Sequence, residues 1–272
     1  MMRPNLDGLV AVVTGAGRGL GRAHAIRLAA AGSAVLVNDV GANPSGQGTD
    51  LAVAETVSAE IVAAGGRAVA NADSVASFEG AERIIDAAVE HFGSVDILIN
   101  NAGFVTSTAL SDLDEARLLS LMSVHFIGAV GTMKAAIPRM LGGGFGRVVN
   151  TVSETSFDHR TETSLGYGAA KAAVWSATLA AARRVEGTSV TVNGLSPGAR
   201  TRTSAAHLDA VGSPPDLDLA PERVADVVAL LVSREMADVN GRIVHTAGGV
   251  VREYCVERRR DTDLVERLSA SL

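Results

Sequence analysis

Two side chains near the middle of the chain, Tyr167 and Lys171, have the types and the spacing for acid–base chemistry. They lie four positions apart in YGAAK, within a helical pattern, so both side chains share one helix face. A phenol has a pKa of about 10, too high for a good base at neutral pH, and an adjacent ammonium would lower it. Ser153, just after a predicted strand, could hold a substrate oxygen beside the phenol. Because this spacing is also common on helix surfaces, the pair indicates catalysis only beside a nicotinamide cofactor.

A glycine-rich turn near the N-terminus, TGAGRGLG, is suited to such a cofactor. It lies between a predicted strand, Leu9–Val13, and an alanine-rich helical pattern that ends at Gly32. Glycines in this setting let the backbone approach a pyrophosphate above the helix N-terminus. We expect the dinucleotide contacts to come from Gly15, Arg18, Gly19, Leu20 and Gly21.

Asp39, at the end of the second predicted strand, bears on the choice between NAD and NADP. A carboxylate there accepts hydrogen bonds from the adenosine ribose and repels the additional phosphate of NADP. Arg18 could attract that phosphate, but the carboxylate faces it across the ribose and has the stronger effect. We therefore predict NAD. Asp73 and Ser74, past the third predicted strand, lie where an adenine edge would lie, and they are equally compatible with capping the next helix.

The elements that must position these residues alternate along the chain. Short apolar runs predict strands at Leu9–Val13, Ala34–Asp39, Arg67–Asn71, Val95–Gly103, Gly146–Ser153, Val190–Gly198 and Gly241–Thr246. Helical patterns follow at Leu51–Ala64, Phe78–His91, Asp114–Leu141, Leu165–Glu186 and Pro221–Val232. This alternation indicates an α/β fold, a single doubly wound parallel sheet of about seven strands with helices on both faces. We expect one domain over 1–250, with a substrate lid at about 199–219, and a charged C-terminal arm over 251–272 that is most simply a solvated helix.

Composition narrows the classes of partner. The 272 residues carry a net charge of −6, which argues against a nucleic-acid or anionic-membrane binder. The chain has one cysteine, no evident signal peptide and no apolar run that approaches a bilayer span, so we expect a cytoplasmic protein. Its six histidines show no ligand spacing, so we expect no metal.

Together, TGAGRGLG, NNAG (100–103), Ser153, YGAAK and SPG (196–198) occur in an order and spacing that resemble the short-chain dehydrogenase/reductase family, a Rossmann-like fold. The resemblance implies that Tyr167 is the general acid/base, that Lys171 lowers its pKa and binds the nicotinamide ribose, and that Ser153 orients the carbonyl or hydroxyl. It implies further cofactor contacts from Tyr167 itself and from Asn101, Ala102, Gly103, Pro197, Gly198 and one of Thr201 and Thr203.

His125, in the apolar run LMSVHFIG, is by itself more typical of a core residue. In the family, however, its position holds an asparagine that anchors a water in the proton relay near Lys171. An imidazole can also hold a water, and it titrates near pH ~6.5. The resemblance therefore implies a supporting relay role for His125.

Further motifs, VNDVGANPSGQG, AVANADSV, SVHFIG and NGRIVHTAGGVVREYCVERR, resemble the (3R)-hydroxyacyl-CoA dehydrogenase part of peroxisomal multifunctional β-oxidation enzymes and its stand-alone bacterial relatives. We expect an NAD-dependent oxidoreductase that interconverts a secondary alcohol and a ketone, with 3-hydroxyacyl-CoA as one candidate substrate. The alternatives are 3-oxoacyl-carrier-protein reduction, a sterol or xenobiotic alcohol, and a catalytically silent NAD-binding regulator. The intact Ser153, Tyr167 and Lys171 argue against the regulator. An alanine-rich helix with Trp175 favours a homodimer or homotetramer.

Overall fold

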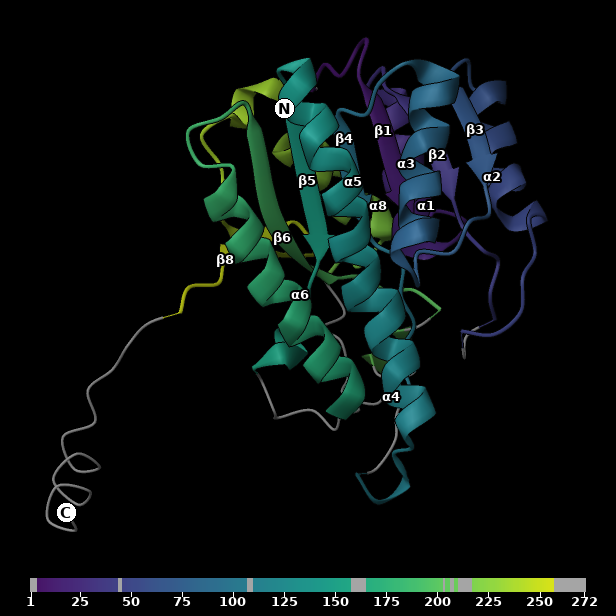
Figure 1. The fold of residues 1–272 in the computed structure, drawn as a ribbon, viewed down its shortest axis with the longest axis vertical. Helices are drawn as coiled ribbons and strands as arrows, with labels where there is room; N and C mark the ends of the chain where they lie inside the picture. The colour runs from purple at the N-terminus through teal and green to yellow at the C-terminus, as the bar shows by residue number, and fades with distance from the viewer. Residues whose placement is uncertain are drawn as a thin grey trace, which may run out of the picture.

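An eight-stranded sheet runs through the centre of the computed structural model of this chain (Figure 1). The structure describes residues 4–43, 46–106, 110–157, 165–202, 204–205, 208–209 and 217–256. The strand order is β3-β2-β1-β4-β5-β6-β7-β8, parallel throughout except for the antiparallel pair β7 and β8. The strands are β1 Val10–Thr14, β2 Ala34–Asn38, β3 Arg67–Asn71, β4 Ile97–Asn100, β5 Gly146–Thr151, β6 Val190–Gly198, β7 Ile243–Ala247 and β8 Val250–Glu253.

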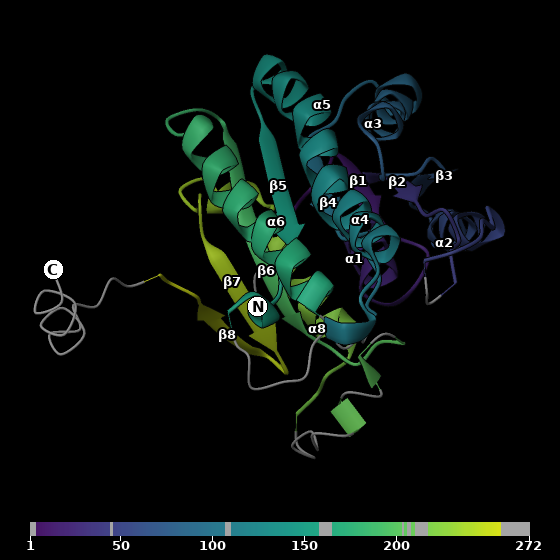
Figure 2. The same ribbon diagram turned by 60° about the horizontal axis from the view of Figure 1, so that its bottom comes forward.

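Helices cover both faces of the sheet, which Figure 2 shows from its lower end. One layer consists of α1 (Gly19–Ala30), α2 (Ala52–Ala63) and α8 (Pro221–Leu231). The opposite layer consists of α3 (Phe78–Phe92), α5 (Gly128–Gly143) and α6 (Leu165–Arg184). α4 (Glu115–Met122) continues into α5 through a π-helical turn, Ser123–Ile127. Short 3₁₀ turns lie at Leu110–Asp112, Glu154–Ser156 and Arg234–Met236.

Alternation along each strand divides the core into two apolar layers. On β1, Ala11 and Val13 pack with α1, α2 and α8, whereas Val10 and Val12 pack with α3, α5 and α6. Both faces of the central strands are therefore buried, and for this reason the strands are continuous apolar runs. The predicted doubly wound α/β fold is confirmed.

The C-terminal end differs from the prediction. Val250–Glu253 is an eighth strand, antiparallel to β7, where we expected the charged arm to begin at residue 251. Gly248 and Gly249 have φ of 53° and 80°, and this left-handed backbone lets the chain reverse sharply between the two strands. The solvated helix is therefore wrong for 251–253, and residues 257–272 lie outside the described part of the chain.

The long helical segment Glu115–Gly143 is the one described segment whose length and composition would allow it to cross a membrane. Its apolar side chains have another explanation, because Met133, Ala136 and Met140 are buried against the sheet and α3. The segment was also predicted as an uninterrupted helix, whereas the structure has a π-helical turn at Ser123–Ile127. Such turns occur frequently at functional sites, and this one carries His125.

Candidate active site

The site lies at the carboxyl ends of the parallel strands, where the order of strands reverses between β1 and β4. The glycine loop follows β1, NNAG overlaps the end of β4, Ser153 follows β5, and Pro197 and Gly198 end β6. The sheet thus brings together four predicted segments that are far apart in the sequence.

Close backbone contacts explain the glycine loop. Gly15 has a φ of 62°, and a Cβ atom there would lie 2.8 Å from Ala102 Cα. A Cβ at Gly21 would lie 2.0 Å from the Gly15 carbonyl oxygen. Helix α1 begins at Gly19 after an extended Arg18, and no described side chain caps it. The first amides of α1 therefore have no side-chain cap, and the pyrophosphate contacts expected of Gly19, Leu20 and Gly21 stay a prediction.

Asn101 braces this loop from β4. Its side-chain amide donates to the carbonyl oxygens of Thr14 and Gly15, at 3.0 and 3.1 Å. The Thr14 hydroxyl in turn accepts the backbone amides of Asn101 and Ala102, both at 3.1 Å. In this structure Asn101 thus positions the glycine loop, and its direct cofactor contact stays a prediction.

The carboxylate of Asp39 faces the same loop. Its Oδ2 accepts the Gly17 amide at 2.8 Å and its Oδ1 accepts the Gly41 amide at 2.7 Å. The sequence reasoning missed Gly17, where a Cβ atom would lie 2.2 Å from Val53 Cγ1 and 2.9 Å from Asp39 Oδ2. The middle glycine of TGAGRGLG was the available signal. Arg18 is exposed and donates to a different partner, the Ala42 carbonyl, at 3.1 Å.

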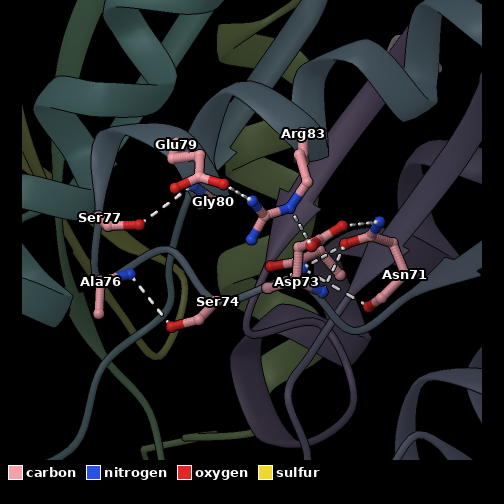
Figure 3. A network of polar contacts seen from close by, with 9 residues as sticks. Asn71, Asp73, Ser74, Ala76, Ser77, Glu79, Gly80 and Arg83 are labelled. Atoms are coloured by element: carbon pink, nitrogen blue, oxygen red, sulfur yellow. Dashed lines mark hydrogen bonds and ion pairs between the residues drawn. The ribbon is translucent and has the colours of Figure 1, made fainter.

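Asp73 belongs to a polar network at the end of β3 (Figure 3). It forms an ion pair with Arg83 at 2.7 Å and accepts the Asn71 amide at 2.9 Å. Burial raises the pKa of Asp73, but the hydrogen bonds from Arg83 and Asn71 outweigh burial and lower the pKa below its usual value. Asp73 therefore remains a carboxylate, and its adenine contact remains a prediction.

Neither Asp73 nor Ser74 caps the following helix. The Ser74 hydroxyl accepts the Ala76 amide at 3.2 Å, within the preceding turn. The N-cap of α3 is Ser77, whose hydroxyl accepts the Gly80 amide at 3.1 Å, as Figure 3 shows. The capping alternative is thus wrong for both residues, because α3 begins later than either could reach.

The structure brings Ser153, Tyr167 and Lys171 together, as predicted. Tyr167 and Lys171 lie on α6, with the Lys171 Nζ 5.8 Å from the centroid of the Tyr167 ring. Lys171 is buried and donates to the Thr151 carbonyl at 2.7 Å. Burial raises the pKa of Tyr167, and a hydrogen bond with Ser153 opposes that rise.

The expected lowering of the Tyr167 pKa is not what the structure shows. Burial dominates and the net shift is upward, while the opposing contribution comes from Ser153. Burial also lowers the pKa of Lys171 to about 7, so its own charge is only partial near neutral pH. In this state, therefore, the phenol is the stable form of Tyr167, poised to act as an acid.

His125 packs directly against this group. Its ring meets that of Tyr167 edge-on, with centroids 5.5 Å apart and an interplanar angle of 81°. Burial and the neighbouring Lys171 lower the pKa of His125 to about 3. The expected titration near pH 6.5 is therefore wrong, and the imidazole is neutral. Gly103 makes room for it, since a Cβ there would lie 2.2 Å from the His125 Cε1.

A small cavity of about 10 Å³ lies between His125 and Lys171. Thr14, Asn100 and Thr151 contribute to its lining. This volume is close to the minimum that one water molecule needs. The Nδ1 of His125 is buried and makes no hydrogen bond to any residue that the structure describes.

Beyond Ser153, the substrate side contains a residue that the sequence reasoning missed. The Thr155 hydroxyl donates to Ser153 Oγ at 3.0 Å, and the Thr155 amide approaches the same oxygen at 3.3 Å. A second hydroxyl two positions from the predicted one in SETS was the available signal. Thr155 thus fixes the orientation of the Ser153 side chain.

The predicted lid is described only in part. Thr201 lies over the glycine loop, because a Cβ at Gly19 would lie 3.4 Å from Thr201 Cγ2. Thr203 lies outside the described residues, so of the two predicted threonines only Thr201 is placed near the cofactor loop. A hydrogen bond of 2.8 Å from the Arg200 amide to the Leu219 carbonyl joins the two ends of the segment in which the lid was predicted. Among the described residues, no group of three His, Cys, Asp or Glu side chains could hold a metal ion.

The comparison with protein families agrees with this geometry. A model of the short chain dehydrogenase family matches residues 9–209. The chain therefore belongs to the short-chain dehydrogenase family, and it is an oxidoreductase that acts on CH–OH groups.

Similar curated proteins refine the comparison. A putative short-chain type dehydrogenase/reductase of Mycobacterium tuberculosis is 38% identical, over 93% of this chain and 87% of that protein. A hydroxyacyl-CoA dehydrogenase of the same organism is 34% identical, over 95% of this chain and 84% of that protein. The peroxisomal hydratase-dehydrogenase-epimerase of Neurospora crassa is 37% identical over 93% of this chain. The match covers only 27% of the Neurospora protein.

Solved structures share the whole fold. A short chain dehydrogenase from Mycobacterium avium has a TM-score of 0.81 at 33% identity, covering 98% of this chain and 95% of its own. A short chain dehydrogenase from Burkholderia cenocepacia, solved in complex with NADP, has a TM-score of 0.79 at 31% identity, covering 90% and 98%. A nicotinamide cofactor is therefore common to the family, whereas its NAD or NADP form is not given by the fold.

Proposed function

We propose that this protein is an NAD-dependent dehydrogenase that interconverts 3-hydroxyacyl-CoA and 3-oxoacyl-CoA. The observation that carries the proposal is the hydrogen-bonded pair Ser153 and Tyr167, with Lys171 beside it on α6, at the strand ends that also carry the glycine loop. The relatives named hydroxyacyl-CoA dehydrogenase and peroxisomal hydratase-dehydrogenase-epimerase support the substrate class.

Asp39 supports NAD over NADP. Both of its oxygens accept backbone amides of the turns around the glycine loop, so the charge is fixed beside the region where the adenosine ribose would bind. A ribose phosphate there would meet a carboxylate, and Arg18, which reaches Ala42 instead, does not neutralise it. The uncapped start of α1 and the glycine backbone would hold the pyrophosphate.

When bound, the nicotinamide supplies the hydride chemistry, and the protein supplies the proton. In ketone reduction, Tyr167 donates its phenol proton to the substrate oxygen, and the Ser153 hydroxyl donates a hydrogen bond to the same oxygen. In alcohol oxidation, the phenolate of Tyr167 takes the proton back. Burial lowers the pKa of Lys171 to about 7, and the protonated form of Lys171 stabilises that phenolate.

His125 is proposed to hold a water that connects Lys171 to solvent. Its Nε2 lies 2.9 Å from the Phe104 carbonyl and 3.3 Å from the Phe104 amide. The shorter contact favours a proton on Nε2 and leaves Nδ1 as an acceptor. One water in the adjoining cavity could donate to Nδ1 and accept from Lys171. Because the imidazole is neutral, it would orient the water rather than transfer charge itself.

A cofactor and substrate panel tests the proposed function. Turnover would be measured with NAD and with NADP on (3R)- and (3S)-hydroxyacyl-CoAs of several lengths, on hydroxyacyl-carrier proteins, on sterols and on simple secondary alcohols. The proposal expects kcat/KM to be highest for NAD with a hydroxyacyl-CoA. A preference for NADP with a carrier protein, or for a sterol, would replace the proposed substrate. Cofactor binding without turnover on any of these alcohols would favour a regulatory role.

The proposed assembly is a homodimer or homotetramer. Helix α6 presents alanines and the exposed Leu179, a surface on which a second helix could pack closely. Light scattering of the purified protein tests this, and a monomer mass would remove the proposal.

A further inference from the structure

An aromatic cluster stands beside the turn that follows Ser153. Its members are Phe157, at the end of that turn, Trp175 on α6, and Tyr254 directly after β8. The Phe157 ring lies 5.0 Å from the Tyr254 ring and 5.2 Å from the Trp175 ring, both edge-on. In a chain with one tryptophan and two tyrosines, these rings join three distant segments at one point.

Tyr254 also makes a polar contact with this turn. Its hydroxyl donates to Glu154 Oε2 at 2.7 Å, across 100 positions of sequence. Its own backbone is fixed, because the Tyr254 amide donates to the Ile243 carbonyl of β7 at 2.9 Å. The antiparallel strand that the sequence did not predict therefore carries a residue to the rim of the active site.

The turn that Tyr254 contacts determines where the Ser153 proton points. Ser153 is the N-cap of the 3₁₀ turn Glu154–Ser156, and its oxygen accepts from both the amide and the hydroxyl of Thr155. A hydroxyl has two acceptor sites and one proton. With both acceptor sites used by Thr155, the Ser153 proton is directed to Tyr167 or to a substrate oxygen.

We propose that Tyr254 is a positioning residue for Ser153, acting through Glu154 and the turn between them. The β7–β8 hairpin thereby positions a residue for the reaction and also forms the edge of the sheet. This inference rests on the proposed function only in that Ser153 must assist turnover. Glu154 and Phe157 are exposed, so burial does not hold them in place. The hydrogen bond from Tyr254 to Glu154 and the ring contact of Tyr254 with Phe157 hold them instead.

Substitutions that separate the hydroxyl, the charge and the ring test the inference. Tyr254→Phe keeps the ring and removes the hydroxyl, and Glu154→Gln keeps an acceptor but removes its charge. Tyr254→Leu removes the ring as well. Glu253→Gln is the matched control, because it removes an exposed ion pair with Arg242 one residue away from Tyr254. Each variant would be measured for kcat, KM, NADH affinity, melting temperature and Trp175 emission.

Loss of one charge-assisted hydrogen bond should reduce kcat/KM about tenfold in Tyr254→Phe and less in Glu154→Gln. NADH affinity and melting temperature should stay at their wild-type values in both variants. Glu253→Gln should keep wild-type values of all the measured quantities. The double variant Tyr254→Phe/Glu154→Gln should be no worse than Tyr254→Phe, because both changes break the same contact. The emission of Trp175, the single tryptophan, should differ between Tyr254→Leu and the wild type. In a separate experiment, the emission of the wild type should shift when a hydroxyacyl-CoA is added.

Two results would overturn the inference. One is wild-type kcat/KM in Tyr254→Phe beside an inactive Ser153→Ala, which leaves the proposed function intact. The other is a fall in NADH affinity and in melting temperature together with the fall in kcat/KM in Tyr254→Phe, which would make the role of Tyr254 merely structural. Full turnover in Ser153→Ala would instead contradict the proposed function, and the positioning role would fail with it.

Discussion

The cofactor side and the substrate side of this site are built in different ways. On the cofactor side, backbone meets backbone at the glycines, as where Gly15 lies against Ala102, and the side chains of Asn101 and Asp39 bind backbone groups of the same loop. On the substrate side, side chains hold side chains, as in the contacts of Thr155 with Ser153 and of Tyr254 with Glu154. Backbone contacts tolerate one residue type, glycine, whereas side-chain contacts can be made by many. The cofactor side should therefore depend on glycine at single positions, and the substrate side on matched pairs of side chains.

The largest expected effect on cofactor binding comes from breaking the backbone contacts. A methyl group at Gly21 would lie 2.0 Å from the Gly15 carbonyl oxygen, so Gly21→Ala must displace the loop. We expect NADH affinity to fall about 100-fold or more, the loss of roughly 3 kcal/mol of loop and pyrophosphate contacts. Gly142→Ala is the control, because its methyl group would meet nothing within 4 Å. Unchanged NADH binding in Gly21→Ala would contradict the backbone account of the cofactor side.

A smaller effect should follow from changing the charge at Asp39. Asp39→Asn keeps the size but only one of the two acceptor oxygens, so it loses the contact with either the Gly17 or the Gly41 amide. It also removes the repulsion of the ribose phosphate, so the preference for NAD over NADP should fall about tenfold or more. The ratio of kcat/KM with the two cofactors measures it. Asp50→Asn, an exposed carboxylate that serves as the control, should leave the ratio unchanged. An unaltered ratio in Asp39→Asn would show that another residue selects the cofactor.

His125 tests the substrate side, where we expect an effect of about tenfold. His125→Ala should lower kcat more than it lowers NAD affinity, because it removes a water anchor and leaves the Phe104 carbonyl without its partner. His125→Asn should keep substantial turnover. The neutral state of the imidazole adds a pH test. The pH profile of kcat should have the same shape near pH 6.5 in the wild type and in His125→Asn, because His125 does not titrate there. Equal, unimpaired turnover in both variants would assign His125 to core packing.

The smallest effect on turnover, none, is expected at His24, a buried histidine of α1 on the cofactor side. Burial lowers its pKa to about 4, and neither ring nitrogen has a partner among the described residues. Since the unfolded chain binds the proton more readily, His24 costs stability as pH falls from about 6.5 to 4, by up to about 3 kcal/mol. His24→Leu should flatten that decline in urea titrations at several pH values. An unaltered pH dependence would mean that other groups cause it.

The parts of the fold that were predictable from sequence depend on local regularity. The strands β3 and β6 match the predicted bounds because an apolar run and its turns lie within a few residues. The glycine loop and YGAAK were equally readable, since close approach and helix spacing are short-range requirements. The π-helical turn at His125 was not, because the His125 side chain contacts Gly103, Phe104 and Tyr167, which are distant in the sequence. The contact of Tyr254 was not predicted for the same reason, because its hydrogen-bond partner Glu154 is 100 positions away in the sequence.

The central claim is that Tyr167 performs proton transfer beside a cofactor site that does not depend on it. Tyr167→Phe keeps the ring against His125 and removes only the phenolic oxygen. NADH titration and turnover should be measured on one preparation of this variant. We predict that NADH affinity stays within about twofold while kcat falls about 10³-fold. Wild-type turnover in Tyr167→Phe, with NADH bound as tightly as before, would contradict the account.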